Sequence, residues 1–176
     1  MGAGERFESL YRMHARAVRA YVLRRSREDE GDDVVAEVFL VAWRRLDDVP
    51  VDGLPWLLGV ARRVLANRRR GQSREIALKA RLVAEDIAPL GWPLADPDDR
   101  VLRVLSTLPP ADQEVLLLVA WEELEPARAA AVIGVRAGTF AMRLHRARRR
   151  FARALAADAS CTEDPAMESE LPEVLR

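Results

Sequence analysis

The sequence predicts an all-α protein of two small helical domains, joined by a Pro/Gly/Asp-rich linker, with a helix-turn-helix in the second domain. Ala, Leu, Arg and Glu dominate the 176 residues, and the long apolar patterns repeat with the helical period rather than alternating as in strands. Four helix breakers, Pro89, Gly91, Pro93 and Pro97, interrupt these patterns within 88–99. A hydrophobic content of 49% is ample for two small cores.

The first domain is expected over residues 1–86. Its helices are predicted at 6–25, 32–46 and 56–70, with weaker helical propensity over 74–86. The acidic residues of 28–33 form a break and then a first helical turn, where carboxylates suit the positive end of the helix. Pro50 and Gly53 indicate a loop over 47–55.

The linker is expected over 87–98 and the second domain over 99–157. Its helices are predicted at 99–107, from Pro110 to Glu123, and as a pair of helices that turns at Gly134. The longer helix of this pair carries an apolar stripe of Leu144, Ala147, Phe151 and Leu155. Residues 158–176 are polar and acidic, and we expect this tail to be disordered.

The helix at 32–46 is apolar on more than one face. One stripe contains Val35, Phe39, Ala42 and Leu46, and a second contains Val34, Val38 and Val41. A helix of this kind either lies at the centre of a bundle or is shared between a core and a partner. We assign Trp43 to the core.

The formal net charge is zero, with 28 basic and 28 acidic residues. The charges are distributed in blocks, however, so neutrality does not exclude a nucleic-acid partner. Residues 59–81 hold eight basic side chains and one acid. The second block of the same kind has seven arginines and no acid, namely Arg136, Arg143, Arg146, Arg148, Arg149, Arg150 and Arg153. Such a helix can dock on its domain and present guanidinium groups to phosphates, although an ordinary solvated face has the same composition.

Other features argue against catalysis and membrane insertion. His14 and His145 are too few and too far apart to indicate a metal site, and no nucleophile set, paired carboxylates or phosphate loop is visible. We therefore predict no enzyme activity, no cofactor and no metal. The single Cys161 fits a reducing cytoplasm, and the absence of a long apolar run predicts a cytoplasmic protein without membrane insertion.

Three stretches together resemble the extracytoplasmic-function sigma factors of bacterial RNA polymerase. They are DVVAEVFLVAWRRL at 33–46, PWLLGVARRVLANRRR at 55–70, and LPPADQEVLLLVAW at 108–121 with its continuation through Gly138, Thr139 and RLHRAR at 143–148. Their order also matches that family. The resemblance implies binding to core RNA polymerase and to promoter DNA, both as duplex and as melted single strand.

In this family the helix matching 33–46 docks on the clamp helices of the largest polymerase subunit. The resemblance therefore assigns polymerase binding to Asp33, Glu37, Val38, Val41, Arg44 and Arg45. Burial on all sides is the alternative for this helix.

The loop at 47–55 and the helix from Trp56 match the family's reader of the melted promoter element near position minus ten. Opening a duplex requires a positive groove for the backbone and a pocket for an unstacked base. The resemblance assigns the groove to Arg62, Arg63, Arg69 and Arg70, and a base or phosphate contact to Asn67. Asp48, Val49, Asp52 and Gly53 shape the pocket or are solvated turn residues. Trp56 either stacks on a base or packs on its own bundle.

The helix-turn-helix would read duplex DNA near position minus thirty-five. The resemblance assigns base contact to Arg143, phosphate contacts to Arg136 and Arg146, and a DNA contact to Thr139. Ala141 and Met142 stand where the family usually carries a polar pair, which affects sequence preference. Arg148, Arg149 and Arg150 contact phosphates or the polymerase flap, or are solvated.

Two other functions remain open at this stage. A stand-alone helix-turn-helix regulator would bind an operator without polymerase, and a partner-binding protein would have lost DNA readout. Members of the family are also held by an anti-sigma factor that wraps both domains, which predicts such a partner here. The acidic tail 158–176 either competes with DNA for the basic helices or is an ordinary disordered tail.

Overall fold

The computed structural model describes residues 2–26, 30–80 and 100–162, with side chains given outside 72–80 and 160–162. Within these ranges the regular structure is entirely helical, which confirms the predicted all-α class. The linker expected at 87–98 and the residues from 163 onward lie outside the described part of the chain.

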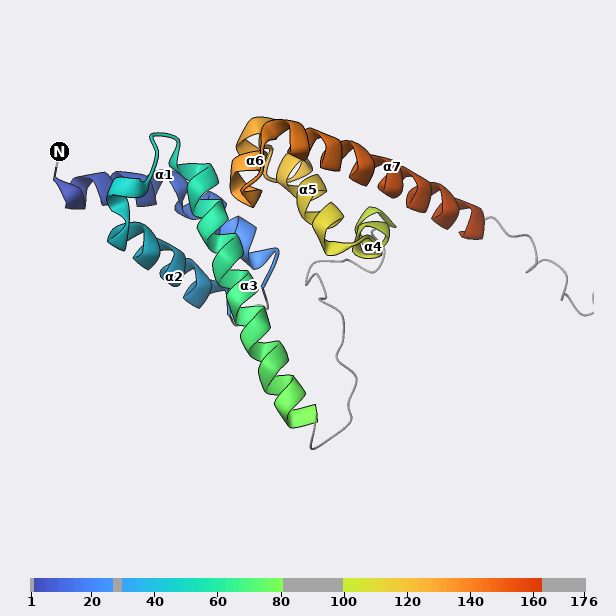
Figure 1. Ribbon diagram of the computed structural model, residues 1–176, viewed down its shortest axis with the longest axis horizontal. Coiled ribbons are helices and arrows are strands. Elements are labelled where there is room, and N and C mark those ends of the chain that lie inside the picture. Colours follow the sequence, from blue (N-terminus) through green and yellow to red (C-terminus); the bar gives the residue numbers. More distant parts are fainter. Residues whose placement is uncertain (1, 27–29, 81–99, 163–176) are drawn as a thin grey trace, which may run out of the picture.

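The first unit contains α1 (Ala3–Leu23), α2 (Gly31–Arg44), a single 3₁₀ turn η1 (Leu46–Asp48) and α3 (Gly53–Ala80). α1 begins where the Gly2 amide donates to the Glu5 carboxylate at 2.8 Å, which satisfies one of the free amides of a helix N-terminus. The three helices pack on one another through side chains that recur at helical spacing (Figure 1). These buried side chains are Val18, Tyr21, Val22, Val34, Val38, Phe39, Ala42, Leu57, Leu58, Ala61, Val64 and Leu65.

Helix α3 is longer than the sequence pattern indicates. It begins at Gly53 rather than Trp56, and it continues without a break to Ala80. Pro55 lies in the first turn, where a helix amide has no partner within the helix, so a proline is tolerated there. The prediction of a loop over 47–55 is therefore wrong at both ends, since η1 occupies the start of this segment and α3 the end.

The second unit contains α4 (Arg100–Ser106), α5 (Pro110–Ala120), α6 (Pro126–Ile133) and α7 (Ala137–Thr162). α6 and α7 form the predicted helix pair. Gly134 ends α6 with φ of +71°, a left-handed conformation that glycine adopts without steric cost. The Val135 amide then donates to the Ala130 carbonyl at 3.0 Å, which closes the turn.

Helix α7 packs on its unit through the stripe that the sequence indicates. Phe140, Leu144 and Ala147 are buried, and Phe151 and Leu155 are half-buried. The helix runs through Thr162, so the prediction of disorder from residue 158 is wrong for 158–162. Asp158 accepts a hydrogen bond from Arg100 Nε of α4 at 2.9 Å, which gives this end of α7 a contact of its own.

The two units pack directly against each other. α6 lies along the N-terminal part of α3 (Figure 1), and their apolar side chains join one continuous core. Gly59 of α3 permits the contact, because a Cβ atom there would lie 3.3 Å from the Val132 carbonyl oxygen. Close approach of two helices at a position without a side chain brings their backbones into van der Waals contact.

Candidate nucleic-acid interface

The outer face of α2 carries most, but not all, of the residues that the sequence assigns to polymerase binding. Asp33, Arg44 and Arg45 are exposed, and Val41 is half-buried. Val38 has no exposed surface, so its assignment to a polymerase contact is wrong: the side chain belongs to the core.

Two other apolar residues of α2 lie on its outer face, whereas Val38 does not. Leu40 is 46% exposed and Trp43 is 48% exposed, so the assignment of Trp43 to the core is also wrong. The Trp43 ring stands edge-on against Phe7 of α1, with the centroids 5.1 Å apart, while Tyr11 of α1 is 46% exposed nearby on the same aromatic cluster. We call Tyr11, Leu40 and Trp43 the apolar patch. An exposed group of large apolar side chains rimmed by charges is typical of a protein interface.

Helical spacing places charged residues of α2 beside Leu40 of this patch. Asp33, Glu37, Leu40 and Arg44 follow one another at steps of three and four residues, so they share one face of α2. Glu37 is not a free charge on this face, because Arg68 of α3 donates to its carboxylate at 3.0 Å. α2 and α3 are thus tied together beside the patch.

The outer face of α3 presents most of the predicted arginines. Arg62, Arg63, Asn67 and Arg70 are exposed, and the Asn67 side-chain oxygen accepts a hydrogen bond from Arg70. Arg69 differs, because it is half-buried and its Nη2 donates to the Arg25 carbonyl at 2.7 Å. Burial lowers the pKa of the Arg69 guanidinium.

Trp56 is half-buried and packs against the hydrophobic core. This arrangement favours the interpretation in which the tryptophan packs on its own bundle, and it leaves only part of the ring accessible. The α3 face therefore offers a nucleic acid mainly the positive charge of its exposed arginines, and only part of one aromatic ring for stacking.

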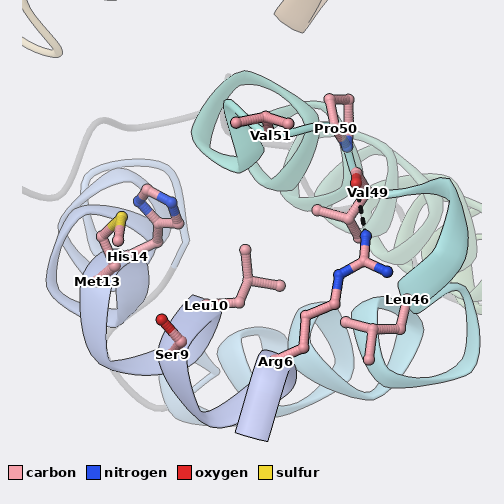
Figure 2. Close-up of a pocket in the computed structure, with 9 residues that line it drawn as sticks. All are labelled: Arg6, Ser9, Leu10, Met13, His14, Leu46, Val49, Pro50 and Val51. Carbon is pink, nitrogen blue, oxygen red and sulfur yellow. Dashed lines mark hydrogen bonds between the residues drawn. The ribbon is translucent and has the colours of Figure 1, made fainter. Parts of the chain in front are cut away.

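The segment before α3 covers a pocket of about 330 Å³ against α1 (Figure 2). Arg6 is one of the lining residues, and its Nη2 donates to the Val49 carbonyl at 3.1 Å. Of the four residues predicted to shape a pocket, only Val49 lines this one. Asp48 instead pairs with Arg45, and Asp52 accepts two hydrogen bonds from Arg128 of α6 at 2.7 and 2.8 Å. The pocket is lined by Arg6, Ser9, Leu10, Met13, His14, Leu46, Val49, Pro50 and Val51.

The outer face of α7 brings together the residues predicted to contact duplex DNA. Thr139, Arg143 and Arg146 are exposed and follow at intervals of four and three residues, so they share one face, and the exposed Arg136 directly precedes the helix. Met142 is 56% exposed beside them. Arg150 is committed elsewhere, because its guanidinium forms an ion pair with Asp112 of α5.

Two family models match the chain. Residues 10–75 match sigma-70 region 2, and residues 98–151 match sigma-70 region 4. The all-helical fold with its helix-turn-helix and its arginine faces agrees with these matches. The chain belongs to the sigma-70 family of RNA polymerase sigma factors, and it is of the extracytoplasmic-function type. Sigma factors regulate transcription and are not catalysts in the usual sense.

A known sigma factor also resembles the chain in sequence. The chain is 32% identical over 127 residues to a probable RNA polymerase sigma factor, RfaY, of Xanthomonas campestris, a match that covers 66% of this chain and 32% of that protein. The chain therefore spans about a third of the length of that relative.

Two solved structures share the fold. The sigma factor RpoE of Bartonella quintana, in complex with the anti-sigma factor NepR, is 24% identical with a TM-score of 0.65, over 86% of this chain and 98% of that one. CnrH, in complex with the cytosolic domain of CnrY, is 27% identical with a TM-score of 0.58, over 86% of this chain and 88% of that one.

The described residues contain neither a membrane-spanning helix nor a cluster of metal-binding side chains. None of the helices there combines the length and apolar content needed to cross a bilayer. In the same part of the chain, no group of three or more His, Cys, Asp or Glu side chains is arranged to hold a metal ion.

Proposed function

We propose that this chain binds core RNA polymerase in the cytoplasm, directs it to promoters with elements near positions minus ten and minus thirty-five, and helps to open the duplex. The observation that carries the proposal is the pair of exposed arginine faces, one on α3 of region 2 and one on α7 of region 4. Two such faces on separate units suit two DNA elements that lie apart on one promoter.

The α7 face supports duplex recognition. A recognition helix enters the major groove and presents three or four side chains to base edges, with neighbouring arginines on phosphates. Arg143 lies in the middle of the exposed row and is the base reader in this proposal, and Arg136 and Arg146 flank it as phosphate contacts. Thr139, one turn before Arg143, completes the contact surface.

The α3 face supports binding of the melted strand. Arg62, Arg63 and Arg70 provide positive charge along the helix, and Asn67 lies among them with both donor and acceptor atoms. The pocket between α1 and the segment before α3 has room for a base, and Arg6, which lines it, provides guanidinium donors for a phosphate or a base edge.

The apolar patch on α1 and α2 supports the contact with polymerase. Leu40 and Trp43 replace Val38 in this proposal, together with the surrounding charges of Asp33, Glu37, Arg44 and Arg45 and the half-buried Val41. Their combination of an apolar centre and a charged rim is the usual composition of a protein interface.

An anti-sigma factor is a further proposed partner. Support comes from the structural relative RpoE, which was solved in complex with the anti-sigma factor NepR, and from CnrH, which was solved with the cytosolic domain of CnrY. A co-expressed anti-sigma candidate that binds the chain should abolish its transcription activity.

Run-off transcription with purified core polymerase and genomic templates from the native host tests the proposal. The chain should bind core polymerase and start transcription at a defined promoter class, and Arg143→Ala with Arg146→Ala should remove that activity. Arg12→Ala on α1 is the matched control. Operator binding without any effect of polymerase would identify a stand-alone regulator instead. Undiminished transcription by the double variant would identify a protein without duplex readout.

A further inference from the structure

An ion pair between α2 and α3 lies beside the apolar patch. The Arg68 guanidinium donates to the Glu37 carboxylate through Nε at 3.3 Å and through Nη2 at 3.0 Å. Both bonds end on the same oxygen, Oε2, so Oε1 of Glu37 has no hydrogen-bond partner within the described part of the chain. The side chains of Arg68 and Glu37 are 33% and 45% exposed. One oxygen of a solvent-accessible carboxylate can therefore still accept a hydrogen bond from a partner.

Arg68 lies on a different side of α3 from the arginines that are proposed to bind the melted strand. It follows Ala61 and Leu65 at steps of four and three residues, and both of these side chains are buried. Leu65 is the last buried side chain among the described ones of α3, and the helix continues well past it (Figure 1). The exposed Arg70 follows Arg68 by two residues, which places it nearly opposite on the helix. Arg68 is therefore placed to act on α2 rather than on a nucleic acid.

The surroundings of Glu37 indicate what kind of group its second oxygen would bind. Glu37 lies about one turn before Leu40 of the apolar patch and one turn after the exposed Asp33. An ionised carboxylate can only accept hydrogen bonds, so its partner across an interface is an N–H or O–H donor. A guanidinium group forms the strongest bonds of this kind. The chemistry beside the patch thus fits a cationic side chain, and best an arginine.

The ion pair matters more for binding than for folding. A pair as exposed as this one contributes little to stability, because water solvates and screens both charges. A glutamate without a partner has several rotatable bonds, and a binding partner must order all of them. Arg68 has already ordered Glu37 before any partner arrives, which lowers the entropic cost of the contact. The positive charge of Arg68 opposes an incoming cation, but solvent screens this repulsion.

We infer that Arg68 is a positioning residue for polymerase binding: it holds Glu37 through Oε2, so that Oε1 accepts a hydrogen bond from a cationic side chain of core polymerase. The inference rests on the proposed function, which places Glu37 on the polymerase face, and it adds a residue of α3 to that contact. Arg68 acts through the carboxylate and makes no polymerase contact of its own. Loss of Arg68 therefore has no further effect once the charge of Glu37 is gone.

A double-mutant cycle in the full chain tests this dependence by titration with purified core polymerase. Glu37→Gln keeps the size of the side chain and removes its charge, so polymerase binding should weaken about tenfold. Arg68→Gln should weaken it about fivefold, because the carboxylate is no longer held. Glu37→Gln/Arg68→Gln should bind as weakly as Glu37→Gln alone. Urea unfolding should show close to wild-type stability for all three variants, because the ion pair is half-exposed.

Matched variants separate positioning from a structural role. Exchanging the charges in Glu37→Arg/Arg68→Glu restores the ion pair and its stability, but polymerase binding should stay at least about tenfold weaker, because a guanidinium replaces the acceptor. Arg12→Gln breaks the exposed Arg12–Glu8 ion pair on α1 and should leave polymerase affinity unchanged. A labelled single-stranded oligonucleotide should lose less affinity with Arg68→Gln than with Arg70→Gln, since the two arginines lie on nearly opposite sides of α3.

Several results would overturn the inference. Additive losses in the cycle would give Arg68 a polymerase contact of its own, and wild-type polymerase affinity of the charge-exchanged variant would reduce the pair to a structural tie. Equal losses of strand affinity for Arg68→Gln and Arg70→Gln would assign Arg68 to nucleic acid. A wild-type chain that binds core polymerase no better than Arg68→Gln overturns the positioning role alone. A wild-type chain that does not bind core polymerase at all overturns the proposed function and this inference together.

Discussion

A Cβ atom on Gly59 of α3 would lie 3.3 Å from the carbonyl oxygen of Val132 in α6. Helices α3 and α6 belong to regions 2 and 4, so this contact lies between the two promoter-reading units of the proposal. Any side chain longer than a methyl group at position 59 must push the helices apart or distort one of them.

Gly59→Leu should therefore separate the units while each remains folded. We expect a larger radius of gyration by X-ray scattering and an overpacking cost of about 1–3 kcal/mol where the units stay in contact. Gly71→Leu on the same helix is the matched control, since a Cβ atom there meets nothing within 4 Å. A compact Gly59→Leu chain with wild-type stability would contradict the contact.

The turn between α6 and α7 allows a test with two glycines. Gly134→Ala should destabilise region 4 by about 1 kcal/mol, because alanine is strained at a φ of +71°. Gly138→Ala, in the first turn of α7 with open space around it, should be neutral or stabilising by up to about 1 kcal/mol. Thermal unfolding of both variants measures the difference, and equal effects at the two positions would refute the assigned backbone conformation.

The proposed docking of the apolar patch on polymerase predicts that substitutions at two positions of α2 have different effects. One should weaken polymerase binding, and the other should lower stability. Trp43→Ala removes an exposed side chain, so binding to core polymerase should weaken about tenfold or more with little change in stability. Val38→Ala removes a buried methyl pair and should lower the unfolding free energy by about 1–2 kcal/mol. Titration of core polymerase and urea unfolding give the two readouts. Wild-type polymerase affinity in Trp43→Ala would exclude the apolar patch as the docking site.

Two arginines of α7 should differ in how they affect duplex binding. Arg143→Ala should cost about 1–3 kcal/mol at the cognate element and relax the base preference at one position. Arg146→Ala should weaken binding to all sequences and reduce the salt slope by about one. Arg153→Ala, further along the same helix, serves as the control for charge alone. Identical specificity profiles for Arg143→Ala and wild type would remove Arg143 as a base reader.

The pocket residue His14 predicts a pH dependence of stability. Burial lowers its pKa below 6.5, the nearby Asp52 opposes this shift, and Arg128 adds to it. Because the unfolded chain then binds the proton more readily, the unfolding free energy is complete above pH 6.5 and falls as the pH drops through the folded-state pKa. His14→Gln should reduce this fall, as measured by urea unfolding at about pH 7.5 and about pH 5.5. An equal or steeper fall in the variant would count against the assigned burial.

The helical class and the turn at Gly134 could be predicted from local sequence, because both depend on residues close together in the chain. Apolar side chains at steps of three and four residues predict a helix and its buried stripe, as with Leu144 and Ala147. The start of α3 could not be read in this way. Pro55 and Gly53 indicate a turn when seen alone, yet both are compatible with the first turn of a helix.

The two errors on α2 have a common cause. Val38 and Trp43 lie on a helix with apolar residues on several faces, and the sequence pattern cannot say which face meets α1 and α3. Packing decides this: the branched Val38 fills the core, and the larger Trp43 ring stands against Phe7 at the surface. A similar limit applies to Arg69. The sequence places it among the DNA-binding arginines of α3, but in the fold it is half-buried and donates a hydrogen bond to the Arg25 carbonyl.

Local patterns of residues were enough to predict the helices, the turn at Gly134, the two arginine-rich segments and the resemblance to sigma factors. The buried ion pair of Arg25 with Glu122, which lie 97 positions apart, could be seen only in the folded chain. Periodicity reports which side of a helix avoids water, whereas pairing between distant charges depends on how complete units pack. In the fold, Glu114 accepts a hydrogen bond from Tyr21, and Glu122 pairs with Arg24 and Arg25, although no local pattern links these residues.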